Sequence, residues 1–94
     1  LNPRILSAAV IGVPDEKSGE VVKAFIVAKD KSLTKKDVVK YARKYLTGYK
    51  LPKHVEFRDH LPETAVGKIL RRQLAAEDRE KHKEEYEKII QDRG

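Results

Sequence analysis

The chain has 94 residues and a formal net charge of +6, and it contains no cysteine. This length allows one small domain with a modest core, and the lack of cysteine excludes disulfide bonds, thiolate metal sites and a cysteine nucleophile. No apolar run approaches the roughly 18 residues of a membrane-spanning helix. The chain begins at Leu1, has no methionine and shows no signal-peptide pattern, so we expect a trimmed chain or a fragment from a reducing compartment.

The charge is unevenly distributed along the chain. Residues 1–76 carry 16 basic and 8 acidic side chains, whereas residues 77–94 carry 5 basic and 7 acidic ones. The basic part is suited to nucleic acid, anionic lipid or a phosphorylated small molecule. A solvated, lysine-rich surface explains the same charge, so both interpretations stay open at this point.

The first two elements are expected to be β-strands. Residues 5–13 and 21–29 are apolar and rich in valine and isoleucine, which is typical of buried strands. The segment between them carries Pro14 and Gly19, which favour a loop. We therefore predict an antiparallel pair whose connection is too long for a tight hairpin.

Residues 33–48 show the clearest helical pattern. Thr34 is a good N-cap, Asp37 would lie near the positive end of the helix dipole, and Gly48 is a stop signal. The spacing of the apolar positions predicts one buried stripe, made of Val38, Tyr41, Ala42, Tyr45 and Leu46.

After an irregular connector at 49–54, residues 55–59 alternate in polarity and predict a third strand, and residues 60–67 predict a loop. A helical pattern starts at Ile69. Residues 77–85 contain no apolar side chain, so we expect a solvated helix there, held by weak ion pairs between residues four apart. The pairs expected are Glu77–Lys81 and Glu84–Lys88, and a small apolar patch of Tyr86, Ile89 and Ile90 follows them.

This order of elements predicts an α+β domain. We expect a small three-stranded, mostly antiparallel sheet with flanking helices and a long C-terminal helix. The expected division is a domain at residues 1–76 and a charged helical extension at residues 77–94.

The stretch LPETAVGKILRR, residues 61–72, superficially resembles a phosphate-binding loop. A nucleotide-binding P-loop needs a glycine where Pro62 stands and a Ser or Thr where Ile69 stands. The stretch is therefore not such a loop, and what remains is Lys68 presented by Gly67. An ordinary surface lysine is the alternative, although a cation at a helix start is slightly unfavourable.

Three motifs carry a resemblance to a known family: GVPD…GE at 12–20, GYKLP at 48–52 and PETAVGKILR at 62–71. Together they make residues 1–76 resemble the small C-terminal domain of the acyl-CoA synthetases, within the adenylate-forming superfamily. The residues of these motifs are most similar to those of the fatty acid–CoA ligases. The chain departs from the family at Glu63, where lysine usually follows the proline, and residues 77–94 match nothing in it.

The resemblance implies a role for Lys68. In the family, a large N-terminal domain binds ATP, Mg²⁺ and the acid, and the C-terminal domain closes over that site as a lid. The motif lysine, here Lys68, contacts the acid and the α-phosphate region while acyl-adenylate and pyrophosphate form. Gly67 would let the backbone approach the substrate closely.

The resemblance also implies a second orientation of the domain, in which coenzyme A attacks the adenylate. Arg43 stands about where related enzymes place an arginine against the coenzyme A 3′-phosphate, with Lys44 and Lys50 as further contacts for the phosphates. A solvated helix arginine is the alternative for Arg43.

We therefore expect the C-terminal domain of an ATP-dependent fatty acid–CoA ligase, inactive on its own. Its hinge, an adjoining strand-turn and its partner, the N-terminal adenylation domain, would lie upstream of Leu1. The expected substrates are a fatty acid, ATP and coenzyme A, with no nucleic acid and no metal ion bound by this domain. The expected location is the cytoplasm, with membrane association of the full enzyme left open.

Other functions stay in view. A small basic nucleic-acid-binding module would use Tyr41 and Tyr45 beside Arg43 and Lys44, and a pure interaction domain would use the charged tail. A metal site is disfavoured because no common spacing links His54, His60 and His82. A catalytic triad is disfavoured too, because none of the three serines stands in a nucleophile elbow.

Overall fold

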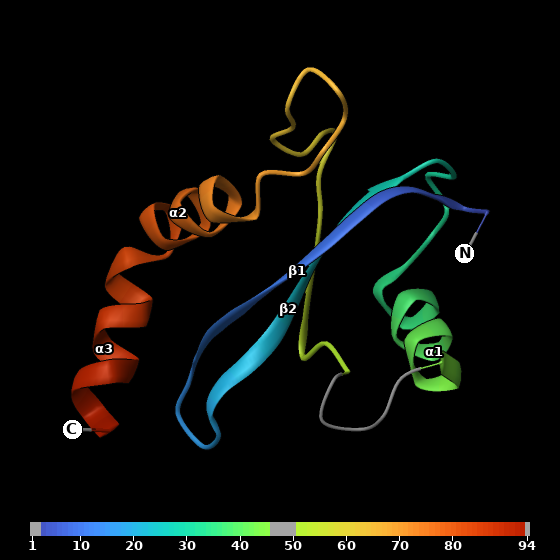
Figure 1. Ribbon diagram of the computed structural model, residues 1–94. Coiled ribbons are helices and arrows are strands. Elements are labelled where there is room, and N and C mark those ends of the chain that lie inside the picture. The colour runs from blue at the N-terminus through green and yellow to red at the C-terminus, as the bar shows by residue number, and fades with distance from the viewer. Residues whose placement is uncertain (1–2, 46–50, 94) are drawn as a thin grey trace.

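The computed structural model describes residues 3–45 and 51–93, and these form an α+β domain, as predicted. The elements in chain order are β1 (Ile5–Asp15), β2 (Gly19–Ala28), α1 (Lys35–Tyr45), β3 (His54–Phe57), α2 (Arg71–Lys81) and α3 (Lys83–Arg93). The sheet order is β1-β2-β3, with β1 and β2 antiparallel and the short β3 parallel to β2 (Figure 1). In the part of the chain described, no helix has the length and apolar character needed to cross a membrane.

The connection between β1 and β2 is a tight hairpin, so the prediction of a long loop was wrong. The strands pair through Asp15 and Gly19, which leaves residues 16–18 as the turn. The Asp15 carboxylate accepts hydrogen bonds from the backbone N–H groups of Lys17 and Ser18 at 3.1 and 2.9 Å. Gly19 has a φ of 83°, which a side chain would disfavour. Turn chemistry of this kind extends both strands beyond their apolar runs.

Strand β2 is buried on both faces, and each face has its own helix. On one face Phe25 and Val27 pack with Leu74 of α2, and both Phe25 and Leu74 are completely buried. On the other face Ala24 and Ile26 pack with Val38 of α1 and with Leu33. The helices α1 and α2 accordingly lie on opposite sides of the sheet (Figure 1).

Helix α1 begins as predicted, with Thr34 as its cap. The backbone N–H of Asp37 donates to Thr34 Oγ1 at 3.2 Å, and the N–H of Thr34 donates to the Asp37 carboxylate at 3.0 Å. This reciprocal pair is a capping box with aspartate in the place of glutamate. The predicted stop signal, Gly48, lies outside the described residues.

The predicted long C-terminal helix is two helices, α2 and α3, which meet at His82 with φ −114° and ψ 24°. The break lets each helix pack separately on the sheet: α2 places Leu74 in the first core cluster, while α3 places Tyr86 against Val13 and Val21. Helix α2 starts at Arg71, and Ile69 instead forms an isolated bridge with Glu63.

The prediction of a solvated helix over residues 77–85 was wrong at Asp78 and at the break at His82, whereas residues 79–81 and 83–85 are helical and exposed, as expected. The Asp78 side chain is almost fully buried, and it accepts a hydrogen bond from the Lys23 ammonium. Charged side chains can be buried when they are paired and hydrogen-bonded. Neither of the two ion pairs expected within this helix occurs among residues 3–45 and 51–93; Glu77 instead pairs with Arg58 at 3.0 Å.

Four carboxyl groups have a pKa below the ordinary value, which is 3.8 for aspartate and 4.5 for glutamate. In each case a hydrogen-bond donor favours the ionised form. The carboxyl groups and their main donors are Asp15 with the Ser18 N–H, Asp30 with the Ser32 hydroxyl, Asp37 with the Thr34 N–H and Glu77 with the Gln73 amide.

We expect the stability of the chain to fall in acid. A carboxyl whose pKa is lower in the folded state than in the unfolded state stabilises the fold fully only above its unfolded pKa. The contribution of these four groups should therefore be constant near neutral pH and be lost as the pH falls below about 4.5. Urea denaturation at a series of pH values measures this. The replacement Asp37→Asn should flatten the acid dependence, whereas Glu84→Gln on the exposed side of α3 should leave it unchanged.

Candidate functional site

The turn that carries Lys68 is closed by its own hydrogen bonds. It projects from the sheet between β3 and α2 (Figure 1). The Thr64 N–H donates to the Lys68 carbonyl at 2.8 Å, and the Gly67 N–H donates to the Thr64 carbonyl at 2.9 Å. The Lys68 N–H donates to Thr64 Oγ1 at 3.1 Å. The backbone of Lys68 is therefore held through both its N–H and its carbonyl group, each of which is hydrogen-bonded to Thr64.

Gly67 is required by backbone conformation. Its φ is +85°, in the left-handed region that residues with a side chain rarely adopt. A Cβ atom built on it would meet no heavy atom within 4 Å. The absence of a side chain therefore lets the turn reverse direction directly before Lys68, and it leaves open space beside the turn.

The Lys68 side chain is exposed, while its neighbour Ile69 packs against the buried cluster of Phe25, Leu61 and Leu74. No ion pair within residues 3–45 and 51–93 involves the Lys68 ammonium. The arrangement presents a solvated cation at the tip of a turn whose base is anchored in the core. A cation in this position can approach a negatively charged substrate that this domain does not itself enclose.

The other predicted site residues lie on α1. Arg43 and Lys44 are exposed, and Arg43 lines a groove along the helix together with Lys36, Val39 and Lys40. Lys50 lies outside the described residues. In Figure 1 helix α1 and the Lys68 turn lie well apart on the domain. The structure therefore does not bring Lys68 and Arg43 together into one site.

A buried polar cluster, which the sequence analysis missed, lies between the sheet and the C-terminal helices. The Lys23 ammonium is 2.5 Å from Asp78 Oδ1, 3.2 Å from Glu56 Oε1 and 3.5 Å from His82 Nε2. The Tyr86 hydroxyl donates to Asp78 Oδ2 at 2.6 Å. Lys23 is 6% exposed and Asp78 3%, so the ion pair at the centre of this network is desolvated, while the Glu56 and His82 side chains are partly exposed. The network joins β2, β3, α2 and α3.

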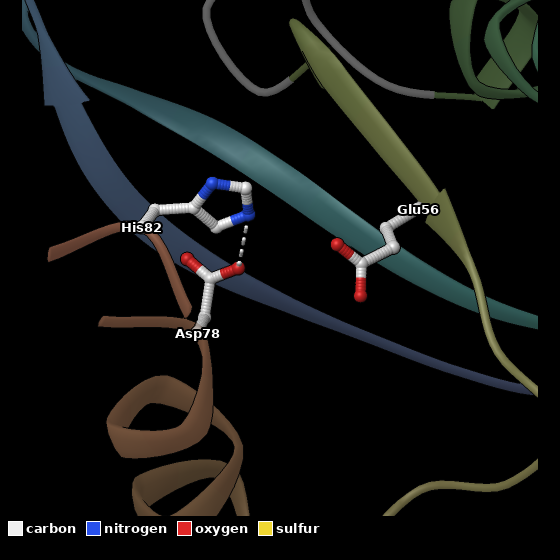
Figure 2. Close-up of side chains that lie close together, drawn as sticks. All are labelled: Glu56, Asp78 and His82. Atoms are coloured by element: carbon white, nitrogen blue, oxygen red, sulfur yellow. Dashed lines mark ion pairs between the residues drawn. The ribbon is translucent and has the colours of Figure 1, made fainter. Parts of the chain in front are cut away.

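The side chains of Glu56, Asp78 and His82 are grouped as metal ligands often are (Figure 2), and their ligand atoms lie within 4.8 Å of one another. The Lys23 ammonium, however, lies within 3.5 Å of all three. The Lys23 ammonium thus occupies the point where a metal ion would bind, and a second ammonium, that of Lys81, lies 3.6 Å from Glu56 Oε1, so each carboxylate already has a cationic partner. We therefore assign the cluster to an ion-pair network and not to a metal centre.

The protonation of Tyr86 follows from this surrounding. Burial of the phenol, together with its hydrogen bond to the Asp78 carboxylate, raises the pKa of Tyr86 far above the ordinary value of 10. The hydroxyl therefore stays protonated, which keeps it a donor to Asp78.

Two features of the sequence point to this cluster in retrospect. Lys23 interrupts an otherwise apolar strand, and Asp78 follows the buried Leu74 by four residues, which places both on one face of α2. A charge of each sign at positions expected to be buried is the signal of a buried pair. What the sequence could not show is that these two positions face each other.

The comparisons with known proteins agree on a family. Residues 1–68 match the AMP-binding enzyme C-terminal domain. Long-chain-fatty-acid–CoA ligases of Yersinia pestis and Haemophilus influenzae are 58% and 55% identical over 78 residues, which are 83% of this chain and 14% of each relative. The solved fatty acyl CoA synthetase of Mycobacterium tuberculosis is 41% identical with a TM-score of 0.70, over 78% of this chain and 14% of that one.

The chain thus spans about 14% of the length of these relatives. The family match covers the hairpin, α1, β3 and the turn up to Lys68. The chain therefore belongs to the AMP-binding enzyme C-terminal domain family, and it is a C-terminal domain of the kind found in adenylate-forming acyl-CoA ligases.

Proposed function

We propose that this chain is the lid domain of an ATP-dependent fatty acid–CoA ligase and that Lys68 is its catalytic residue. The relatives above are named as ligases of long-chain fatty acids, which favours that class of substrate. The acid and ATP would be bound mainly by an N-terminal adenylation domain, together with Mg²⁺, and this domain would close over them.

The observation that carries the proposal is the presentation of Lys68. Its ammonium is exposed and lies on a turn that three hydrogen bonds close and that the core anchors next to it. A residue that acts only when two domains close must be free of partners in its own domain and must also have a fixed backbone. Lys68 meets both conditions within the described part of the chain.

The chemistry that such a lysine can supply is electrostatic. Adenylate formation brings a carboxylate against the α-phosphate of ATP, so negative charge accumulates on the phosphate oxygens in the transition state. An ammonium group placed there stabilises that charge without a proton transfer. The lid that carries this cation also helps to exclude water from the reacting groups.

The basic face of α1 supports a separate role in the second half-reaction. We propose that Arg43 and Lys44 contact the phosphates of coenzyme A after the lid has turned. The separation of α1 from the Lys68 turn fits two orientations of one domain, because each face would meet the active site in a different step. The nucleic-acid alternative receives less support, since Tyr41 is partly buried and so only partly available for stacking on a base.

Replacing Arg43 with alanine in the whole enzyme tests this second role. A charge-assisted hydrogen bond to phosphate contributes about 1.5–3 kcal/mol, so the KM for coenzyme A should rise by roughly 10- to 100-fold. ATP–pyrophosphate exchange, which reports adenylate formation, should be unchanged. The matched control is Arg79→Ala, which removes an exposed arginine from α2 and should affect neither quantity. Equal damage to both half-reactions by Arg43→Ala would instead assign Arg43 a structural role.

A further inference from the structure

Two segments connect the Lys68 turn to the rest of the domain, one entering it and one leaving it, and we call them its stems. The entering stem is β3 with Arg58 just after it, and the leaving stem is α2. The turn's own hydrogen bonds fix its internal shape, but they do not fix its orientation relative to the sheet. That orientation depends on the core contacts of Leu61 and Ile69 at the base of the turn and on how the two stems are held.

Both stems are held by ion pairs that cross from one to the other. Lys23 of β2 bridges Glu56 on the entering stem and Asp78 on the leaving stem, at 3.2 and 2.5 Å. Arg58 on the entering stem binds Glu77 on the leaving stem at 3.0 Å. We call these five residues, Lys23, Glu56, Arg58, Glu77 and Asp78, the stem clamp.

The Lys23–Asp78 pair of the stem clamp differs from surface ion pairs in its burial, whereas the Arg58–Glu77 pair is partly exposed. The Asp78 side chain is 1% exposed and that of Lys23 is 8% exposed, and the Tyr86 hydroxyl satisfies the second Asp78 oxygen. Networks that are buried and fully hydrogen-bonded favour one arrangement, because any displacement leaves a charge without its partner. Helix α2 is a short rigid rod. Fixing Glu77 and Asp78 therefore also fixes the position of its N-terminal end, which the chain enters through Leu70 shortly after Lys68.

The apolar contacts alone hold the leaving stem less completely. Leu74 is the one fully buried apolar side chain that α2 contributes within the described residues, and the preceding Leu70 is partly exposed. A helix held at a single apolar position can still rotate about that contact. The charged contacts at Glu77 and Asp78 supply the second and third points of attachment.

We propose that the stem clamp is a positioning device for the catalytic lysine: the Lys23–Asp78 and Arg58–Glu77 pairs set where the turn presents the Lys68 ammonium. This inference rests on the proposed function of Lys68. The clamp residues do not touch the substrate; they act through the turn. Their contribution belongs to adenylate formation, because only that half-reaction uses Lys68.

The test compares three variants in the whole enzyme. Asp78→Asn removes the buried charge with almost no change in shape. Glu77→Gln removes the partner of Arg58 at a position that is about 40% exposed, where loss of folding is not expected. Glu84→Gln on α3 is the matched control, because Glu84 is exposed and forms no ion pair within residues 3–45 and 51–93.

Two quantities are measured for each variant. The first is the amide hydrogen exchange of the turn and of the β1–β2 hairpin. The second is the rate of each half-reaction, with adenylation followed by ATP–pyrophosphate exchange and thioester formation followed from supplied acyl-adenylate and coenzyme A. Amide hydrogen exchange does not depend on catalysis, so it tests whether the clamp holds the turn independently of the role of Lys68.

Asp78→Asn and Glu77→Gln should speed exchange at the Thr64 and Leu70 amides and leave exchange in the hairpin unchanged. Because small misplacements of a catalytic group are costly, the kcat of adenylation should fall by roughly 10- to 100-fold. The KM for ATP and the rate of thioester formation should stay as in the parent enzyme, as should every quantity in Glu84→Gln.

Lower thermal stability with normal turn exchange and normal adenylation would overturn the proposal, since it would make the clamp merely structural. Faster turn exchange with normal adenylation would overturn the positioning role as well. If Lys68→Ala were also without effect on adenylation, the proposed function itself would be the part that fails, and the exchange data would still report whether the clamp holds the turn.

Discussion

Replacing Lys68 with alanine in the whole enzyme should slow acyl-adenylate formation by about 10²- to 10³-fold, the usual effect of removing one transition-state donor. In the proposed function, the Lys68 ammonium is the positive charge that the lid adds next to the α-phosphate. The stability of the protein should stay within about 0.5 kcal/mol, because the side chain is exposed and no ion pair of the described residues depends on it. ATP–pyrophosphate exchange and thermal denaturation measure the two quantities.

The matched control for this variant is Lys88→Ala. Lys88 is an exposed lysine of α3, which lies far from the Lys68 turn in Figure 1. Both variants remove one positive charge, so a general effect of net charge would appear in both. A similar loss of adenylation in Lys88→Ala would refute a specific role for Lys68.

Replacing Lys23 with methionine should cost about 3–5 kcal/mol of unfolding free energy, because it leaves the Asp78 carboxylate buried without its cation. Methionine keeps most of the volume of the lysine stem, so the loss would report the charge and not a cavity. Chemical denaturation of the chain measures it. Lys29→Met, at an exposed position just after β2, should change the unfolding free energy by no more than about 0.5 kcal/mol.

The double replacement of Lys23 by methionine and Asp78 by leucine separates two explanations of that loss. Replacing a whole buried pair by apolar side chains of similar size is often neutral, so the double variant should recover part of the stability lost by Lys23→Met, less the cost of leaving the buried Tyr86 hydroxyl without its Asp78 acceptor. A loss below about 1 kcal/mol in Lys23→Met would be that of a solvated surface pair, and it would contradict the burial described above.

Local signals in the sequence predicted much of the fold. Val38 and Ala42 are buried on α1 at the predicted spacing, and Thr34 caps that helix. The apolar runs of β1 and β2 predicted their pairing correctly. These features depend on residues close together in the chain, where propensity and periodicity are informative.

The failures share a different cause. The hairpin turn depends on the side chain of Asp15 binding two backbone N–H groups, which shortened the loop beyond what composition suggested. The buried state of Asp78 depends on Lys23, which lies 55 residues away in the sequence. Contacts of that separation leave no periodic trace in a single sequence, so a helix face that looked solvated was in fact paired.

The residues of the candidate site also fall into two groups, those found from a local motif and those that depend on contacts between distant segments. Lys68 and Gly67 were found from a local motif, and the structure shows the positive φ of Gly67 and the exposure of Lys68. The roles of Lys68, Arg43 and Lys44 remain proposals. The stem clamp was not predicted, because its members come from three separate segments of the chain: β2, β3 with the residue after it, and α2.

The most direct test of the central claim supplies preformed acyl-adenylate and coenzyme A to the Lys68→Ala enzyme and measures the rate of thioester formation. If Lys68 acts only while the lid is closed for adenylation, this rate should stay within about twofold of that of the parent enzyme, while adenylation falls by about 10²- to 10³-fold. A comparable fall in both half-reactions, in a variant that remains folded, would contradict the assignment of Lys68 to the first half-reaction alone.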